Sequence, residues 1–365
     1  MNSFERPLRL RPMRVVRTYT GGKLLDAWQG ISPAFDGHRP EEWVASTITS
    51  RFAEDPNAGL SILDDGSAEP TYLRDHIASF PKEILGKRHF DAYGESSGFL
   101  AKLIDSENRL NIQAHPDREK AWEYFNSPFG KTESWYIIET REIEGQQPYI
   151  LLGFKPGITK ERWKRLVNEQ DIGALEDCLH KIPVEPGEVY FVESGMPHAI
   201  GSGCLLAEIQ EPTDFTFRVE KMTLDGVPYP EEVYHQGIGY EKMFECFHYS
   251  GASYADTLSQ VKVQPEMLSH DTNHELFALL TAKQTSCFSM KKLTVRGLHE
   301  SSPSDVFCTA VVIGGRGTLR CQSEILELGR SNELFLPASQ QKLIWESTGS
   351  EELEVLLFYP PSATL

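Results

Sequence analysis

The sequence lacks long apolar runs, and it is poor in positive charge. No stretch reaches the length of about 18 apolar residues that a membrane helix needs, so we expect no membrane partner. Lys and Arg number 36 against 53 Asp and Glu, which gives a formal net charge of −17. Nucleic-acid binding requires clustered cations, so this composition argues against it. A small anionic substrate remains compatible, because it needs only a local positive pocket.

Cysteine pairs of the CxxC type are also missing. The six cysteines are spread from Cys178 to Cys321, several of them among apolar neighbours, as in Cys204-Leu205-Leu206. A Cys-rich zinc site is therefore not expected. The pattern is typical of reduced, mostly buried thiols and predicts a cytoplasmic protein.

Short apolar runs broken by Gly, Pro, Asn and Asp dominate from about residue 95 onward. Their length and their β-branched and aromatic content are typical of strands in a sandwich or barrel. The strands predicted in this way are Phe99–Ile104, Leu110–Gln113, Trp135–Glu139, Tyr149–Phe154, Val189–Val192, Cys204–Gln210, Cys287–Leu293, Val306–Ile313, Gly317–Cys321, Glu333–Leu336, Leu343–Glu346 and Leu353–Phe358.

Three segments are predicted to be helical. Residues 71–87 form the first, and Asp117–Asn126 the second, with Pro116-Asp117 suited to a helix start. The third is Thr159–Lys181, where apolar residues recur near helical spacing and Gly173 predicts a break. We expect these helices to interrupt an otherwise β-rich chain.

A faint internal repeat suggests two similar β modules. Val189–Gly195 resembles Glu333–Ser339, since both read as a short apolar strand followed by a turn of small residues. In this alignment His198 of the first copy corresponds to Lys342 of the second. Only the first copy therefore keeps a residue type that binds metals.

Three further segments carry residue types suited to metal binding and acid–base chemistry. Gln113 and His115 are two positions apart, as are Lys131 and Glu133, so each pair shares one face of an extended chain. His198 follows a predicted strand and a tight turn. Gln113, His115, Glu133 and His198 together offer oxygen and nitrogen ligands suited to zinc, iron or manganese, with a position left open for substrate.

These segments resemble motifs of the type I phosphomannose isomerases, which belong to the cupin superfamily. That family has L-S-I-Q-x-H-P-D, G-K-T-E and G-x-x-H-A segments. The corresponding residues here are Leu110-Asn111-Ile112-Gln113-Ala114-His115-Pro116-Asp117, Gly130-Lys131-Thr132-Glu133 and Gly195-Met196-Pro197-His198-Ala199. Leu206–Gln210 and Thr213–Val219 resemble the family's L-x-E-I-Q and S-D-x-T-Y-R-V segments, so order and spacing agree over Leu100–Val219.

The resemblance implies a mainly β fold of two cupin-like barrel or jelly-roll modules. Residues 1–255 would form the catalytic module, with a helical insertion around 159–181, and residues 256–365 a module without metal ligands. The implied reaction interconverts mannose 6-phosphate and fructose 6-phosphate through an enediol. One zinc ion per chain would be held by Gln113, His115, Glu133 and His198. The expected partner is this small phosphorylated sugar, and the expected assembly is a monomer or a homodimer.

The same resemblance suggests roles for residues around the metal. Glu208 is the candidate base, since a carboxylate in a partly enclosed site can take a proton, and Lys131 is its rival. The alternative for Glu208 is a structural hydrogen bond within the barrel. Arg218 would stabilise the enediolate or grip the phosphate, because guanidinium binds such groups in a fork. Its alternative is an ion pair with Asp214 or Glu220.

Lys102 and Asn111 are the candidate phosphate-binding residues. Lys102 matches a family lysine near the substrate phosphate, although it can also be an ordinary outward-facing strand residue. Asn111 stands where the family has Ser, and an amide can still donate hydrogen bonds to phosphate. Glu193 stands where the family often has Pro. These departures affect substrate preference rather than the metal site.

Two other functions compete with isomerisation. One is a non-catalytic, metal-containing cupin that binds sugar phosphates. The other is an iron cupin oxygenase using the same ligands. Gln113 in place of a histidine, and Lys131 beside Glu133, argue against the oxygenase.

Overall fold

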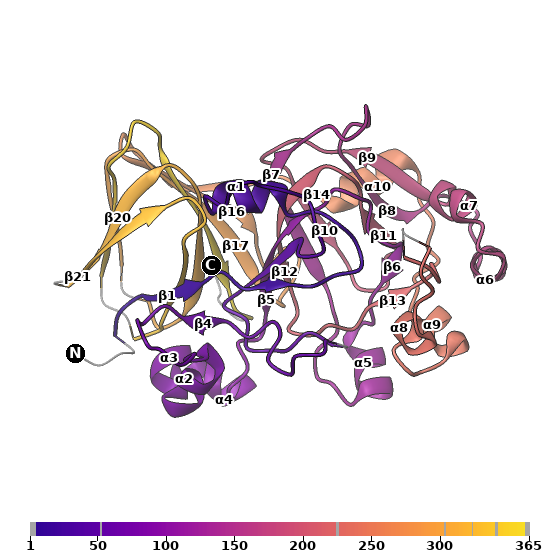
Figure 1. Cartoon of the computed structure of the whole chain (residues 1–365), viewed down its shortest axis with the longest axis horizontal. Coiled ribbons are helices and arrows are strands. Elements are labelled where there is room, and N and C mark those ends of the chain that lie inside the picture. Colours follow the sequence, from indigo (N-terminus) through magenta and orange to yellow (C-terminus); the bar gives the residue numbers. More distant parts are fainter. Residues whose placement is uncertain are drawn as a thin grey trace.

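The computed structural model describes residues 5–51, 53–223, 226–302, 304–322, 324–339 and 342–361. Two β lobes lie side by side, one built from the C-terminal strands and the other from the middle of the chain (Figure 1). The strands form four antiparallel sheets, so the expectation of a mainly β protein is confirmed. None of the described helices is long and apolar enough to cross a membrane.

An eight-stranded and a four-stranded sheet form the C-terminal lobe. The eight-stranded sheet has the order β15 (Glu266–His270), β16 (His274–Leu280), β17 (Ser289–Val295), β24 (Leu353–Tyr359), β19 (Cys308–Gly314), β22 (Glu333–Leu336), β1 (Leu8–Arg11) and β4 (Ile62–Leu63). The four-stranded sheet has the order β18 (Leu298–Ser301), β23 (Leu343–Ser347), β20 (Arg316–Cys321) and β21 (Glu324–Gly329). Because β1 pairs with β22, the two ends of the chain share one sheet.

A seven-stranded and a five-stranded sheet form the other lobe. The seven-stranded sheet has the order β14 (Lys262–Val263), β10 (Val189–Val192), β7 (Glu133–Thr140), β12 (Cys204–Gln210), β5 (Leu100–Asp105), β3 (Glu41–Val44) and β2 (Arg14–Val15). The five-stranded sheet has the order β13 (Phe217–Arg218), β6 (Gln113–Ala114), β11 (His198–Ile200), β8 (Tyr149–Phe154) and β9 (Leu179–Pro183).

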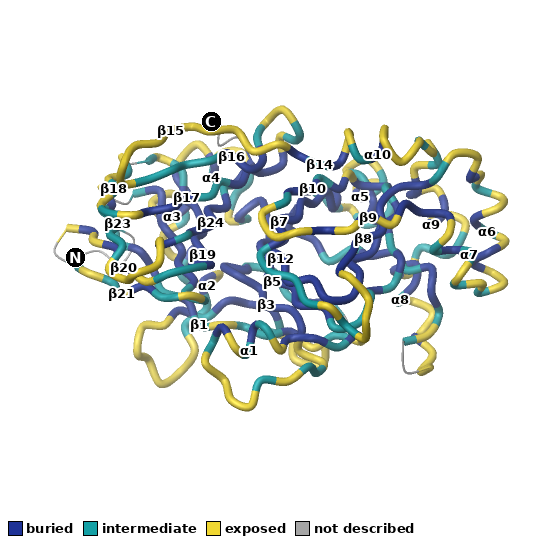
Figure 2. Tube along the Cα trace, turned by 90° about the horizontal axis from the view of Figure 1, so that it is seen from above, coloured by how far each residue is buried: buried dark blue, intermediate teal, exposed yellow. Residues whose placement is uncertain are grey.

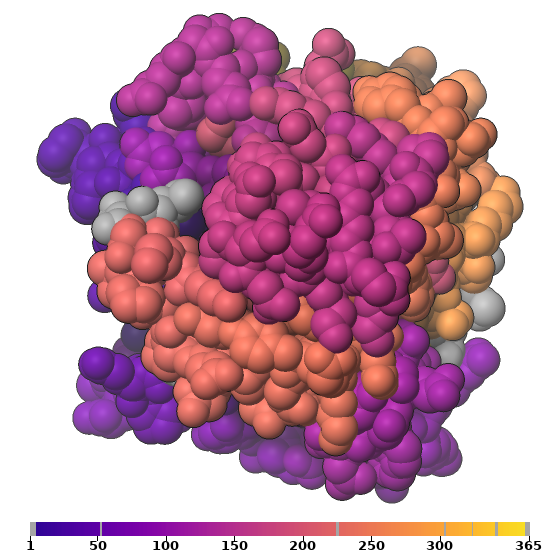
Figure 3. Space-filling model, turned by 90° about the vertical axis from the view of Figure 1, so that its right-hand side faces the viewer, coloured from indigo at the N-terminus to yellow at the C-terminus, as the bar shows by residue number. Residues whose placement is uncertain are grey.

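Ten short helices lie around these sheets in the described residues. They are α1 (Lys23–Trp28), α2 (Leu73–Ser79), α3 (Pro81–Leu85), α4 (Lys87–Tyr93), α5 (Arg118–Phe125), α6 (Lys160–Glu169), α7 (Ile172–Asp177), α8 (Glu231–His235), α9 (Tyr240–Glu245) and α10 (Tyr254–Val261). α6 and α7 lie beside the segment of α8 and α9, and together they cover the end of the molecule opposite the C-terminal lobe (Figures 1 and 3).

The structure corrects three details of the predicted elements. The helix predicted over residues 71–87 is divided among α2, α3 and α4, with Pro81 starting the second. The insertion breaks at Gln170, whose φ is 54°, rather than at Gly173, and its last residues join β9. Leu110–Ile112 lie outside any strand, because regular pairing starts only at β6.

The largest hydrophobic core joins the two lobes. Leu103 and Ala207 of the seven-stranded sheet share it with Phe335, Leu356 and Phe358 of the eight-stranded sheet. Figure 2 shows buried chain where these sheets meet and exposed chain at the outer loops. Since burying such side chains stabilises a fold by about 2 kcal/mol each, this core fixes the two lobes against one another.

Candidate active site

The seven-stranded and five-stranded sheets bring three predicted ligands together. His115 follows β6, Glu133 begins β7 and His198 begins β11. Among the described residues, these three form the one His/Cys/Asp/Glu group able to hold a metal ion, with ligand atoms within 4.8 Å of one another. Glu133 Oε2 lies 3.3 Å from His115 Nε2, and Glu133 Oε1 lies 3.2 Å from His198 Nε2.

Backbone contacts orient both histidines toward this cluster. The Nδ1 atom of His115 lies 2.8 Å from the carbonyl oxygen of Phe215, and that of His198 lies 2.8 Å from the carbonyl oxygen of Met196. Each Nδ1 therefore carries the proton of the neutral ring, which leaves the Nε2 lone pair facing the cluster. This is the arrangement found around metal-binding histidines.

The remaining polar atoms also suit a cation. Glu133 Oε1 is buried and has no hydrogen-bond partner, which is costly for a carboxylate unless a cation meets it. The Gln113 amide lies 3.3 Å from His198 Nε2, so its oxygen can turn to the same point. The Lys131 ammonium lies 2.6 Å from Glu133 Oε2 and 2.8 Å from His115 Nε2. The residues present therefore fit a divalent metal.

The electrostatics of the cluster keep its groups in the states that bind metals. Burial, with the Lys131 ammonium, lowers the pKa of His115 to about 3, and burial also lowers the pKa of His198. Burial alone would raise the pKa of Glu133, but Lys131 and the two histidines lower it well below its usual value. At neutral pH both rings are neutral and the carboxylate is charged.

A second buried group lies on neighbouring strands of the seven-stranded sheet. Lys102 of β5 donates to Glu208 Oε1 at 2.9 Å and to Gln210 Oε1 at 2.7 Å. Trp135 of β7 donates through Nε1 to Glu208 Oε2 at 3.0 Å. Both oxygens of Glu208 thus accept hydrogen bonds, and the ion pair with Lys102 stabilises its charged form.

One pocket connects this group with the metal cluster. It has a volume of about 50 Å³, opens to solvent and is lined by Asn111, Gln113, Lys131 and Arg218 together with the Lys102–Glu208 pair. Six of the nine predicted site residues thus line this pocket. The other three, His115, Glu133 and His198, lie behind its wall in contact with Gln113 and Lys131. This placement does not by itself assign their roles.

Arg218 has no ion-pair partner in the described part of the chain. Its guanidinium lies within hydrogen-bond reach of two carbonyl oxygens, those of Val233 at 3.3 Å and Thr216 at 3.5 Å. The ion pairs that were its alternative role do not form, because Asp214 lies beside Arg17 and Glu220 beside Arg109. Arg218 thus lines the pocket without a direct ion-pair partner in the described residues.

The fold and these motifs can now be compared with known proteins. No family model matches the chain. Mannose-6-phosphate isomerase ManA of Bacillus subtilis is 26% identical over 338 residues, which cover 91% of this chain and 93% of ManA. Mannose-6-phosphate isomerase of Streptococcus mutans is 35% identical over 166 residues, 45% of this chain and 47% of that protein.

Solved structures that resemble this fold include mannose 6-phosphate isomerases. The crystal structure of the mannose 6-phosphate isomerase from Bacillus subtilis aligns with a TM-score of 0.74 at 23% identity, covering 96% of this chain and 99% of that one. The chain is thus similar in sequence and in fold to mannose-6-phosphate isomerases. The resemblance drawn from the motifs and the predicted cupin fold are both confirmed.

A zinc-bound mannose 6-phosphate isomerase is among the structural neighbours. It aligns with a TM-score of 0.71 at 14% identity and covers 97% of this chain and 99% of that one. At this identity the likeness concerns the fold. The candidate metal site of the present chain is inferred from its own residues, His115, Glu133 and His198.

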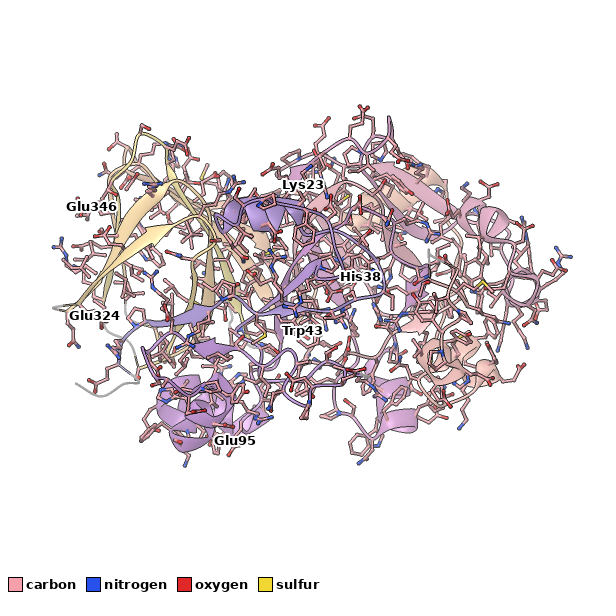
Figure 4. All side chains as sticks on the ribbon, in the orientation of Figure 1. Lys23, His38, Trp43, Glu95, Glu324 and Glu346 are labelled. Carbon is pink, nitrogen blue, oxygen red and sulfur yellow. The ribbon has the colours of Figure 1, made fainter. Side chains whose placement is uncertain are left out.

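Several pocket residues were not predicted from the sequence. Arg17, Tyr19 and Glu41 line the same pocket, where Glu41 accepts hydrogen bonds from Tyr19 at 2.8 Å and from Trp43 Nε1 at 3.0 Å. Burial opposes the charge on Glu41, yet Arg17 and Lys102 lower its pKa to about 2. Trp43 lies in the middle of the molecule, at the side of this network (Figure 4).

Arg17 is the least predictable member of this network. Its guanidinium lies 2.8 Å from Glu41 Oε2 and 3.9 Å from the carboxylate of Asp214. In the sequence it is one of five arginines among the first 17 residues, and nothing local distinguishes it. Only its pairing with buried carboxylates could have identified it.

Asn111, the predicted phosphate-binding residue that departs from the family pattern, has a defined partner. Its Oδ1 accepts a hydrogen bond of 2.7 Å from the hydroxyl of Tyr229, which also lies 2.8 Å from Thr18 Oγ1. The amide oxygen is therefore held, while the amide nitrogen remains able to donate to a ligand in the pocket.

Proposed function

We propose that the protein is a zinc-dependent aldose–ketose isomerase that interconverts mannose 6-phosphate and fructose 6-phosphate. The observation that carries this proposal is the single pocket in which a candidate metal site, a buried carboxylate and an unpaired arginine converge. The reaction moves a proton between two neighbouring carbons through an enediol. It therefore needs a base, a stabiliser for oxygen charge and a grip on phosphate.

The metal would be held by Gln113, His115, Glu133 and His198, one ion per chain. Bound there, zinc would polarise the oxygens of the sugar as a Lewis acid. Two imidazoles with a carboxylate and an amide oxygen are borderline ligands that suit zinc. The contacts of both histidine Nδ1 atoms with backbone carbonyls support this assignment.

We assign the base to Glu208 rather than to Lys131. Glu208 accepts hydrogen bonds from the Lys102 ammonium and from the indole of Trp135, and it lines the pocket. Lys131 instead contacts Glu133 at 2.6 Å and His115 at 2.8 Å, so its amine is engaged by the metal cluster.

The cations of the pocket divide into paired and unpaired ones. Lys102 is engaged with Glu208 and Gln210, so we propose that it contributes to the phosphate site mainly through its charge. Arg218 is free to form a fork with the phosphate or with the oxygens of the enediolate. Asn111 would add a hydrogen bond to the phosphate.

Zinc-dependent turnover of mannose 6-phosphate tests the whole proposal. Purified protein is assayed for fructose 6-phosphate formation with coupling enzymes, first as prepared, then after chelation and then after zinc is added back. Activity should disappear on chelation and return with zinc. His115→Gln should lose both zinc and activity, whereas His270→Gln, a change at an exposed strand residue, should lose neither.

The competing functions predict other results of the same assay. Saturable sugar-phosphate binding without turnover in the zinc-loaded protein would favour the non-catalytic module. Iron in place of zinc, with oxygen uptake, would favour the oxygenase. A reducing, cytoplasmic location is also proposed, because all six cysteines are buried and none forms a disulfide in the described structure.

A further inference from the structure

The C-terminal lobe contains a second pocket, separate from the candidate active site. It has a volume of about 370 Å³ and lies at one end of the interior of the C-terminal barrel. It shares no lining residue with the first pocket. Its walls come from inward-facing residues of five strands, namely Leu293, Cys308, Leu336, Trp345 and Leu357.

The strand pattern explains why a lysine faces this cavity. Successive side chains on β17 point alternately to the two faces of the sheet. Leu293 and Val295 point into the core of the C-terminal lobe, and Lys291 lies on the same face as these two residues. Lys291 is paired in register with Leu357 of β24. An ammonium group therefore occupies a place where the neighbouring layers of the barrel are apolar.

This ammonium has no counter-charge within the described residues. No carboxylate forms an ion pair with Lys291, and its charged end lies 4.8 Å from the centre of the Tyr359 ring. The next residue, Lys292, differs because it forms an ion pair with Glu354. The Lys291 side chain is partly buried, so its ammonium is less hydrated than that of a surface lysine and can pair with an anion in the pocket.

The other titratable groups of the cavity wall do not supply that charge. Burial raises the pKa of the Cys308 thiol to about 12 and raises the pKa of the Tyr359 hydroxyl well above its usual value, so both are neutral. Burial and His274 lower the pKa of His299, which is neutral as well. Glu300 at the edge of the pocket is paired with Lys342.

We propose that this pocket binds a small organic acid whose carboxylate pairs with Lys291 and whose apolar body fills the leucine-lined end of the barrel. The apolar body would lie against the leucines, while the serines of the lining, Ser301, Ser302 and Ser304, lie together on one segment of the wall. The site is thus a second binding function, independent of the proposed isomerase chemistry.

Calorimetric titration with octanoate tests the proposal, with 1-octanol as the uncharged probe of equal length. The wild-type protein should bind one octanoate per chain, and octanol at least tenfold more weakly. Lys291→Met should weaken octanoate binding at least tenfold. Its stability and its turnover of mannose 6-phosphate should be unchanged, because the substitution breaks no ion pair among the described residues and lies outside the first pocket.

Two further variants separate the pocket from general effects. Lys283→Met removes an exposed lysine that pairs with Glu266 at 2.6 Å, and it should bind octanoate as the wild type does. Leu357→Trp fills the cavity but keeps the charge, and it should also abolish binding. The proposal is wrong if octanoate does not saturate the wild type, if octanol binds equally well, or if binding survives Lys291→Met.

Discussion

At the scale of single residues, Arg218 is the residue best placed to bind a negatively charged group in the pocket. It is the cation of the pocket whose guanidinium has no carboxylate partner among the described residues, and its neighbours are backbone oxygens. A fork of N–H groups aimed at developing oxygen charge is commonly worth a factor of about 10² to 10³ in rate. We therefore expect Arg218→Lys, which keeps the charge but loses the fork, to lower kcat about 10²-fold.

Steady-state kinetics with mannose 6-phosphate measure this effect, and zinc content shows whether the metal site is intact. The control is Arg165→Lys, a change at an exposed position of α6. An Arg218→Lys enzyme with wild-type kcat would exclude Arg218 from the stabilisation of the transition state.

At the scale of elements, α5 is tied to the metal site by its first residues. The side chain of Asp117 accepts a hydrogen bond of 2.7 Å from the backbone N–H of Lys120, as expected of an N-cap. This bond supports the prediction from the sequence that Pro116-Asp117 starts a helix. We expect Asp117→Ala to lower the free energy of unfolding by about 1 kcal/mol.

Urea unfolding of the two proteins measures this difference. Asp117→Asn keeps a side-chain oxygen that can cap the helix, so it should lower the free energy of unfolding much less than Asp117→Ala. An equal decrease in both variants would contradict the capping role. The cap matters for the site because Pro116, the neighbour of His115, accepts a 3.0 Å hydrogen bond from the backbone of Lys131.

At the scale of the whole molecule, a buried pair of glutamates lies where the two lobes meet. Glu42 of β3 pairs with Arg14 at 3.0 Å, and Glu333 on β22 faces the Glu42 carboxylate, to which it can donate a hydrogen bond when protonated. Burial and the Glu42 carboxylate raise the pKa of Glu333 well above 4.5. Folded Glu333 thus keeps a proton that the unfolded chain has already lost.

This difference makes stability depend on pH with a defined sign. Above about pH 4.5 the folded state binds more protons than the unfolded state, so stability falls as the pH rises toward the raised pKa. A glutamine at this position cannot ionise, so Glu333→Gln removes this pH-dependent loss of stability. We expect its stability advantage over the wild type to grow from pH 4.5 upward, as measured by urea unfolding at several pH values.

The exposed Glu327 provides the matched control for that series. Glu327→Gln should change the free energy of unfolding equally at every pH, because this carboxylate stays solvated on β21. A pH-independent gap between Glu333→Gln and the wild type would show that Glu333 is ionised in the folded protein.

Local pattern was enough for much of the fold. Tyr149–Phe154, Val189–Val192, Cys204–Gln210 and Glu333–Leu336 are strands with the predicted bounds, because turn residues delimit each apolar run. Local pattern was insufficient at Leu110–Ile112, where pairing partners rather than propensity decide which residues are extended.

The sequence by itself determined the residue types of the site, their order and the shared face of each ligand pair. These follow from side-chain chemistry and from the two-residue period of an extended chain. Tertiary structure alone decided which charges are paired. Lys102 is joined to Glu208 over 106 positions and Arg17 lies beside Glu41, while Arg218 and Lys291 are left without a carboxylate among the described residues. Pairing depends on distances across the fold, and no local pattern encodes those distances.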